Sequence, residues 1–283
     1  MSNFGRDHTI HIDAQEYASF CIFLQQTCGI DLGQNKQYLV ATRVRRIIVE
    51  QKLQSLAELT ALIQQPGARS VRQQVIDAMT TNETFWFRDN YPFDYLLNTC
   101  LPQLAKDKYG APLKIWSAAC SSGQEPYSLS IVAEEFFRRT NNRTMTIDIV
   151  ATDLSSTILE QAKNGIYDRL SITRGLSSER MNQYFDQLDP DSWQAKPAIR
   201  DRIQFKALNL QDSFFLMGKF DIIFCRNVLI YFSQELKTEI LKKLHAQLNK
   251  NGILFLGSSE SISGVIDHFD MVDCNPGVAY RAK

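Results

Sequence analysis

The chain has 283 residues, 44% of them hydrophobic, which is sufficient for one large domain or two unequal domains with a buried core. Its 31 lysines and arginines balance 31 aspartates and glutamates, so no global basic field favours nucleic acid as a partner. No apolar run approaches the roughly 20 residues of a membrane span, and six cysteines without Cys-x-x-Cys spacing favour reduced thiols over a metal site or disulfides.

Helical periodicity without any strand signal characterises the chain before residue 113. The apolar spacing predicts four helices, at residues 13–28, 35–51, 55–64 and 69–79. Asp13 and Glu16 have the spacing of a capping box, and Gly29 is suited to end the first helix. We therefore expect an all-α N-terminal domain at residues 10–79, joined to the rest of the chain by a linker at residues 80–90.

Strands and helices alternate in the remaining chain, which we expect to form a second domain at residues 91–283. Apolar runs predict strands at residues 113–119, 145–152, 203–208, 220–225 and 252–257. Their alternation with helices favours an α/β fold with a largely parallel sheet. A helix is expected from Ser233 to the pair Asn251-Gly252, which is a typical helix end. The pattern of residues 165–203 is less regular and predicts loop with one helix at 178–185.

Polar residues follow the apolar strand predicted at 220–225. Arg226 and Asn227 come directly after it, and Tyr231 lies four residues beyond Asn227. In parallel sheets the ligand crevice lies beyond the carboxyl ends of the strands, so these side chains are placed to reach a ligand. The same pattern also fits a strand end followed by a core helical turn, in which Tyr231 would be a core aromatic residue.

The strand predicted at 113–119 ends in small residues before a helix begins. Residues 118–123 let a backbone approach a ligand, although they have fewer glycines than a pyrophosphate-binding fingerprint. Glu125 opens the helix that follows, where a carboxylate suits a cationic group and would repel a phosphate. Alternatively, Glu125 is an acidic first-turn residue that interacts favourably with the helix dipole.

The strand predicted at 145–152 ends in the carboxylate of Asp153. A carboxylate at this place commonly accepts hydrogen bonds from ribose hydroxyls, although its offset from Gly123 is longer than the usual distance of about 20 residues. Asp153 could instead cap a helix that starts near Ser155. Together the three strand ends suit a nucleoside with a cationic centre and an amino-acid tail, which describes S-adenosylmethionine.

Four ordered blocks of the sequence resemble those of the chemotaxis receptor methyltransferases, the CheR family. They lie at residues 79–88, 117–128, 151–155 and 224–232 and read MTTNETFWFR, SAACSSGQEPYS, ATDLS and FCRNVLIYF. The resemblance runs from the first helix to the C-terminus. It implies a Rossmann-like sheet of an S-adenosylmethionine-dependent methyltransferase, with a small antiparallel β-subdomain inserted at about residues 165–203.

The resemblance also implies a reaction and a set of site residues. A methyl group passes from S-adenosylmethionine to glutamate side chains of chemoreceptor signalling helices, giving a methyl ester and S-adenosylhomocysteine. The cofactor-binding positions that it implies are Asn82, Thr84, Arg88, Glu125, Asp153, Asn209, Leu210, Arg226 and Asn227. Arg88 and Tyr231 would lie nearest the methyl group and position the incoming carboxylate. From the residues alone, Asn82 or Thr84 could be helix caps and Asn209 a strand terminator.

The sequence also bears on partners. Arg43, Arg45 and Arg46 in the second predicted helix would give acidic receptor helices a basic face, although such residues also occur on solvated faces. Some relatives dock on a C-terminal receptor pentapeptide through a glycine-rich loop of the β-subdomain. The corresponding residues 186–197 contain no glycine, so we expect no dependence on such a tether.

Two other functions are compatible with parts of the pattern. A nucleic-acid or amide methyltransferase is disfavoured because the prolines of an Asp-Pro-Pro-Tyr motif are missing after residue 225. A catalytically silent S-adenosylmethionine-binding adaptor of a receptor array would have the same binding residues. The first eight residues lack a signal-peptide core, so we expect a cytoplasmic protein that is not inserted in the membrane.

Overall fold

The computed structural model describes residues 11–108, 111–141 and 145–283, which form two units. One unit contains the described residues up to Thr81 together with Tyr231–Ser233, and the other contains Asn82–Ile230 and Gln234–Lys283. The first eight residues, on which the signal-peptide prediction rests, lie outside the described ranges. Within those ranges, no helix has the length and apolar character to cross a membrane.

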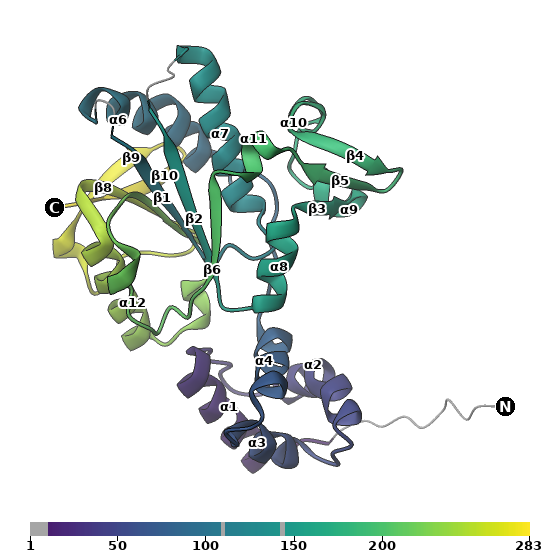
Figure 1. Cartoon of the computed structure of the whole chain (residues 1–283). Helices are drawn as coiled ribbons and strands as arrows, with labels where there is room; N and C mark the ends of the chain where they lie inside the picture. Colours follow the sequence, from purple (N-terminus) through teal and green to yellow (C-terminus); the bar gives the residue numbers. More distant parts are fainter. Residues whose placement is uncertain (1–10, 109–110, 142–144) are drawn as a thin grey trace. The chain divides into compact units, whose positions relative to one another are not determined.

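The N-terminal unit confirms the predicted all-α segment. Its helices are α1 (Ala14–Cys28), α2 (Gln37–Glu50), α3 (Leu56–Gln64) and α4 (Arg69–Met79), and no strand occurs in the part of this unit that the structure describes (Figure 1). The capping box is present: Asp13 accepts the backbone N–H of Glu16 at 2.8 Å, and Glu16 accepts that of Asp13 at 3.3 Å. Gly29 ends α1 with a φ of 77°, a left-handed conformation that glycine adopts without steric cost.

The second unit is built on a seven-stranded sheet with the order β6-β2-β1-β7-β8-β10-β9. The strands are β1 (Leu113–Ala118), β2 (Ile147–Asp153), β6 (Ile203–Ala207), β7 (Phe220–Cys225), β8 (Leu248–Leu256), β9 (Phe269–Cys274) and β10 (Gly277–Ala282). The five strands from β6 to β8 are parallel, as predicted, whereas β10 runs antiparallel to both β8 and β9. The apolar pattern did not predict the β9–β10 hairpin.

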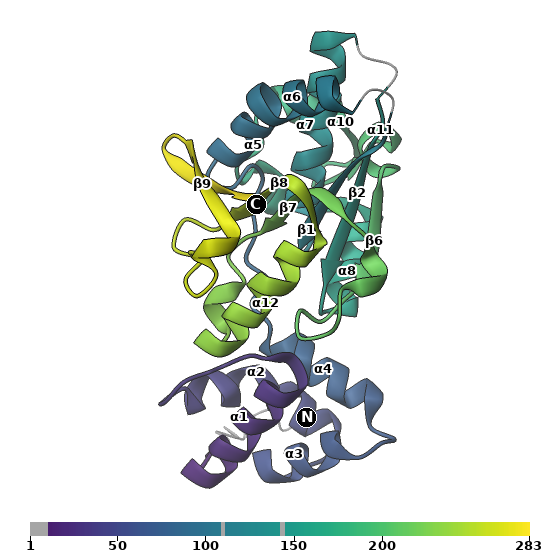
Figure 2. The same ribbon diagram turned by 90° about the vertical axis from the view of Figure 1, so that its left-hand side faces the viewer.

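Helices cover both faces of this sheet. The helix α7 (Gln124–Thr140) connects β1 to β2, and α12 (Gln234–Gln247) connects β7 to β8. These connections leave the centre of the sheet in opposite directions, so right-handed crossovers place α7 and α12 on opposite faces, as Figure 2 shows. A helical segment that was not predicted precedes β1. It consists of α5 (Tyr91–Tyr95), the π-helix η1 (Leu96–Cys100) and α6 (Leu101–Asp107).

The predicted end of the helix after Tyr231 was wrong. The helix α12 stops at Gln247, and Asn251-Gly252 lies inside β8. The pairing of β7 with β8 jumps from Phe220–Leu248 to Ile222–Ile253, so extra residues bulge out of β8 at this pair. Asn251 has a φ of 62° there. An Asn-Gly pair suits a bulge for the same conformational reason that it suits a helix end.

The small β-subdomain that the family resemblance implied is confirmed. It consists of β3 (Ile166–Asp168), β4 (Phe185–Asp189) and β5 (Ser192–Ala195) in the antiparallel order β3-β5-β4. The prediction of loop plus one helix from the pattern alone was wrong, except for α10 (Ser178–Tyr184). Strands of three to five residues are too short to show a clear alternation of apolar and polar residues.

Trp86 anchors the linker to this subdomain. Its ring contacts Tyr167 and Phe185 edge-on, with centroids 4.9 and 5.2 Å away, and its indole N–H donates to the carbonyl of Ser171 at 3.0 Å. Gly175 lies directly against it, since a Cβ there would come within 2.3 Å of the Trp86 carbonyl oxygen. The linker is therefore fixed to the β-subdomain by a buried aromatic residue.

Removal of this anchor should destabilise the α/β unit. Trp86 is only 1% exposed, so Trp86→Ala should lower the free energy of unfolding by about 3–5 kcal/mol. Phe215→Ala is the matched control, because Phe215 is 82% exposed and its loss should cost less than about 0.5 kcal/mol. Chemical denaturation of both variants checks this, and equal stabilities would contradict it.

Candidate functional site

The carboxyl ends of β2, β1, β7 and β8 lie side by side, because these four strands are parallel neighbours. Asp153 is the last residue of β2, and Glu125 and Arg226 come after β1 and β7 at this edge. The structure therefore brings together three of the residues that the sequence singled out.

The loop between β1 and α7 has an unusual backbone. Ala119, Ser121 and Gly123 have φ values of 61°, 51° and 97°. Only glycine fits at position 123, because a Cβ there would lie 2.9 Å from the Tyr167 hydroxyl and 3.0 Å from the Ala162 Cβ. A left-handed backbone with small side chains turns its polar groups outward and leaves little bulk between the loop and a ligand.

Asp153 holds this loop in place. Its carboxylate accepts the backbone N–H of Ser121 at 2.8 Å through one oxygen and that of Ser155 at 3.0 Å through the other. The cap of the following helix α8 (Ser156–Asn164) is Ser155, which accepts the N–H of Ile158 at 3.2 Å. Asp153 therefore connects two loops at the edge of the sheet and is not itself the helix cap.

Ion pairs surround the buried guanidinium of Arg226, whose side chain is 1% exposed. Its guanidinium donates to Asp89 Oδ2 at 2.7 Å, to the Arg88 carbonyl at 2.9 Å and to Glu125 Oε2 at 3.3 Å. The other oxygen of Glu125 accepts the hydroxyl of Ser117 at 2.8 Å. Burial raises the pKa of Glu125, and the positive charge of Arg226 opposes that shift.

The linker reaches the same edge through its backbone. The Asn82 carbonyl accepts the Ser121 hydroxyl at 3.0 Å, and the Phe87 N–H donates to the Ser128 hydroxyl at 3.1 Å. Arg88 donates to the Glu83 carbonyl at 3.3 Å, and its guanidinium lies 5.3 Å from the centroid of the Phe85 ring.

Asn82 and Thr84 do not cap the helix that follows the linker. Thr84 lies half-buried in the linker. The next helix, α5, begins at Tyr91 with Asn90 at its N-cap, so neither Asn82 nor Thr84 is its cap.

The loop after β6 contains the predicted residues Asn209 and Leu210. Asn209 Oδ1 accepts the N–H of Gln211 at 3.0 Å, and Leu210 is buried. The N–H of Leu208 donates to the Asp153 carbonyl at 3.0 Å, which connects this loop to the end of β2. Asn209 follows the strand end and closes a turn, which agrees with the strand-terminator alternative and leaves its ligand role untested.

Asn227 in the loop after β7 is paired with Glu260 in the loop after β8. Asn227 has a φ of 57°, and its N–H donates to Glu260 Oε2 at 2.7 Å. Its side-chain oxygen is buried and has no hydrogen-bond partner among the described residues. Glu260 was missed. The only signal for it was an acidic residue four positions beyond the end of β8.

Tyr231 ends the short helix η3 (Leu229–Tyr231) and is half-exposed, so it is not the core aromatic residue of the alternative interpretation. Its carbonyl accepts the N–H of Asp31 at 2.8 Å, and it groups with the helical unit. The role of Tyr231 near the methyl group stays a prediction.

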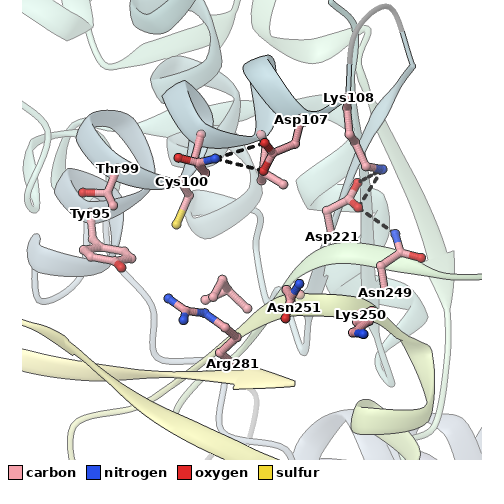
Figure 3. Close-up of a pocket in the computed structure, with 14 residues that line it drawn as sticks. Tyr95, Thr99, Cys100, Asp107, Lys108, Asp221, Asn249, Lys250, Asn251 and Arg281 are labelled. Carbon is pink, nitrogen blue, oxygen red and sulfur yellow. Dashed lines mark hydrogen bonds and ion pairs between the residues drawn. The ribbon is translucent and has the colours of Figure 1, made fainter. Parts of the chain in front are cut away.

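A cavity of about 510 Å³ opens at the amino end of β7, away from these loops, and Figure 3 shows its lining. Asp221 is its buried acid. The carboxylate of Asp221 accepts Lys108 Nζ at 2.8 Å, the Lys114 N–H at 2.9 Å and the Asn249 amide at 2.6 Å. These donors satisfy Asp221 within the fold, so this carboxylate has a structural role.

Comparisons with known proteins agree with the geometry. Residues 82–278 match the family model described as "CheR methyltransferase, SAM binding domain", and residues 15–80 match "CheR methyltransferase, all-alpha domain". Chemotaxis protein methyltransferase Cher2 of Pseudomonas putida is 51% identical over 269 residues, which cover 95% of this chain and 98% of that relative.

Two further relatives are similar over the same span. Chemotaxis protein methyltransferase 1 of Pseudomonas aeruginosa is 54% identical over 271 residues, covering 95% of this chain and 98% of the relative. Chemotaxis protein methyltransferase 1 of Vibrio cholerae is 46% identical over 274 residues, covering 97% and 99%.

Because the pKa of Glu125 is raised, we expect ligand binding to depend on pH. If Glu125 binds a ligand ammonium, it does so as the ionised carboxylate, so binding should release a proton at pH values near the raised pKa. The affinity for S-adenosylhomocysteine should fall as the pH is lowered through that pKa. Calorimetric titrations in two buffers of different ionisation enthalpy measure both effects.

Glu125→Gln is the matched variant, because it keeps the shape of the side chain and removes the titration. It should bind S-adenosylhomocysteine about tenfold or more weakly and lose the proton release. Equal proton release by both proteins would contradict the assignment of Glu125.

Proposed function

Because the chain belongs to the CheR methyltransferase family, we propose that it methylates glutamate side chains on the signalling helices of chemoreceptors. It is an S-adenosylmethionine-dependent methyltransferase. The proposed products are a glutamate γ-methyl ester and S-adenosylhomocysteine. The observation that carries the proposal is the cluster of Glu125, Arg226 and Asp89 at the carboxyl edge of the sheet.

The residues at this edge fit S-adenosylmethionine. The cofactor supplies a methyl group on a sulfonium, and it also carries an ammonium group and two ribose hydroxyls. Glu125 would hold the ammonium, and Asp153 would accept from the ribose. The buried side-chain oxygen of Asn227 is an unused acceptor in the same place. The other cofactor-binding residues implied by the resemblance lie in three places. Asn82, Thr84 and Arg88 lie in the linker, Asn209 and Leu210 in the loop after β6, and Arg226 directly after β7.

The local charge favours a cationic ligand. Asp89 and Glu125 place two carboxylates beside the guanidinium of Arg226. An anionic phosphate would be repelled there, whereas an ammonium or sulfonium would be attracted. This agrees with a nucleoside ligand that carries cationic groups.

The proposed chemistry needs alignment more than proton transfer. A glutamate side chain with a reference pKa of about 4.3 is already ionised at neutral pH and can attack the methyl group without a general base. Holding the carboxylate and the methyl group in line can contribute about 7–11 kcal/mol to lowering the barrier. The role left to the protein is to orient the carboxylate and to exclude water.

Arg88 is the residue proposed to orient the incoming carboxylate. Within the described ranges, no carboxylate forms an ion pair with its guanidinium within 4.0 Å, although its positive charge opposes the burial-induced rise in the pKa of Glu125. Arg88 is also only half-buried. A cation that is near the site and not already in an ion pair is suited to bind an anionic side chain. Tyr231 is the second residue proposed for this role.

The proposed reaction can be tested with methyl-labelled S-adenosylmethionine and membranes that contain chemoreceptors. Label that mild base releases as methanol would identify an ester. Arg88→Ala should reduce kcat/KM for the receptor about 100-fold, and Tyr231→Phe should reduce it less, because that change removes only a hydroxyl group and no charge. A silent adaptor would bind S-adenosylhomocysteine and transfer no label, and that result would contradict the enzymatic proposal.

The basic residues of α2 have unequal environments. Arg43 donates to the carbonyls of Met79 and Thr80 at 2.8 and 3.3 Å, so it stabilises the end of α4. Arg46 forms an exposed pair with Glu50 at 2.6 Å. Arg45 is exposed. We therefore propose Arg45 as the main contact of the three with acidic receptor helices, with Arg43 and Arg46 contributing positive charge nearby.

Charge reversal tests this surface. Arg45→Glu should lower kcat/KM for the receptor roughly 3- to 10-fold and make it less sensitive to salt, with unchanged binding of S-adenosylhomocysteine. Arg69→Glu is the matched control, because Arg69 is an exposed arginine on α4 and gives the same change in charge. Equal losses in both variants would exclude a specific role for Arg45.

Independence from a receptor pentapeptide remains part of the proposal. The turn between β4 and β5 is built by side chains: Asp189 accepts the N–H of Asp191 at 2.8 Å and the hydroxyl of Ser192 at 2.6 Å. A calorimetric titration with a receptor-tail pentapeptide should show no binding, and tight binding would remove this part. The cytoplasmic location expected from the sequence likewise stays a prediction.

A further inference from the structure

Three chain segments meet on the carboxylate of Glu260. Its Oε2 accepts the backbone N–H of Asn227 and that of Gly257, both at 2.7 Å. Its Oε1 accepts the N–H of Leu229 at 2.7 Å and that of Ile230 at 3.4 Å. These donors come from the exit of β7, from the helix η3 and from the end of β8. One side chain therefore fixes the turn that follows β7.

The geometry requires two acceptor oxygens at this position. Each oxygen of Glu260 faces two N–H donors, so both oxygens must act as acceptors. A glutamine has the same shape, but its amide NH₂ would face two of these donors in place of an oxygen. An aspartate is shorter by one methylene group and could not reach all four donors from the same backbone.

Gly257 makes this approach sterically possible. A Cβ at this position would lie 2.6 Å from Asn227 Nδ2, 2.8 Å from Glu260 Oε2 and 2.9 Å from the Asn227 backbone nitrogen. Gly257 also accepts the N–H of Glu260 at 2.9 Å, so the two residues form a reciprocal pair at the end of β8. The glycine and the glutamate act as one unit against the turn at Asn227.

The turn that they hold presents an unused ligand group. Asn227 is in the left-handed region, which asparagine tolerates better than most residues but which still needs support from its surroundings. Its side-chain oxygen is buried, and it finds no hydrogen-bond partner in the described part of the chain. A buried acceptor without a partner is costly in the free protein, and a ligand donor would satisfy it.

We infer that Glu260 is a positioning residue for the cofactor: by binding the backbone of the turn at 227–230, it keeps the Asn227 side chain directed to the ligand. This inference rests on the proposed role of Asn227 in the site. Glu260 touches no ligand in this scheme and acts through Asn227. The function proposed above assigns no role to Glu260.

The test is a double-mutant cycle on the affinity for S-adenosylhomocysteine, measured by calorimetry well below the melting temperature of each variant. Glu260→Gln and Asn227→Ala should each weaken binding about tenfold or more. The affinity of the double variant should not fall below that of the weaker-binding single variant, because both changes remove the same contact. Gly257→Ala should reproduce the loss from the backbone side, and it decides the question if Glu260→Gln does not fold.

Asp221→Asn is the matched control. Asp221 is also a carboxylate that accepts a backbone N–H, but it lies at the amino end of β7. This variant should lower the melting temperature and leave the affinity for S-adenosylhomocysteine within about twofold of the wild type.

The outcomes separate the two claims. If the wild-type protein does not bind S-adenosylhomocysteine, the proposed function fails. If the wild type binds, the inference is overturned by wild-type affinity in Glu260→Gln or Gly257→Ala. It is also overturned if the losses from Glu260→Gln and Asn227→Ala multiply in the double variant, or if Asp221→Asn weakens binding as much as Glu260→Gln does.

Discussion

The buried guanidinium of Arg226 is the interaction on which the site depends. Removing a guanidinium from water is costly unless charged and polar partners replace the lost hydration. Here Glu125 supplies a partner from the start of α7, and Asp89 and the carbonyl of Arg88 supply two from the linker. The requirement to satisfy one buried charge thus joins the end of β7, the loop after β1 and the linker into one structure.

This arrangement explains why the linker has a fixed shape despite an unfavourable backbone. Phe87, Asp89 and Asn90 have positive φ values, which cost free energy in residues other than glycine. The strain is offset on both sides of the turn. Trp86 is buried in the β-subdomain, and Asp89 is held by Arg226. Because Arg88 lies between these two anchors, its backbone is fixed while its side chain stays available to an anionic group.

Much of the fold could be predicted from the sequence, because short-range residue patterns determine many of its helices and strands. The capping box at Asp13 and the apolar runs of the parallel strands depend on neighbouring residues only. The strands of the β-subdomain could not be found in this way, because their stability comes from distant aromatic contacts such as that between Trp86 and Phe185. The family resemblance supplied what the pattern lacked.

The residues of the candidate site also differ in whether the local sequence reveals them. Glu125, Asp153 and Arg226 follow apolar strands, and that position is visible in the sequence. Glu260 could not be recognised, because three of its four partners are backbone N–H groups about 30 residues earlier in the chain, and no side-chain pattern encodes them. Gln124 precedes Glu125 at the start of α7. It is buried and accepts the Ser122 hydroxyl at 2.8 Å, so it contributes to the shape of the loop.

Hydrogen-exchange mass spectrometry with and without S-adenosylhomocysteine tests the location of the site most directly. The account predicts slower exchange in the loops after β1, β2 and β7, at residues 119–125, 153–156 and 226–230. Exchange around the cavity at the amino end of β7, at residues 103–108 and 249–253, should not change. Slower exchange confined to that cavity, or no change at any of the three loops on saturation with the ligand, would contradict the account.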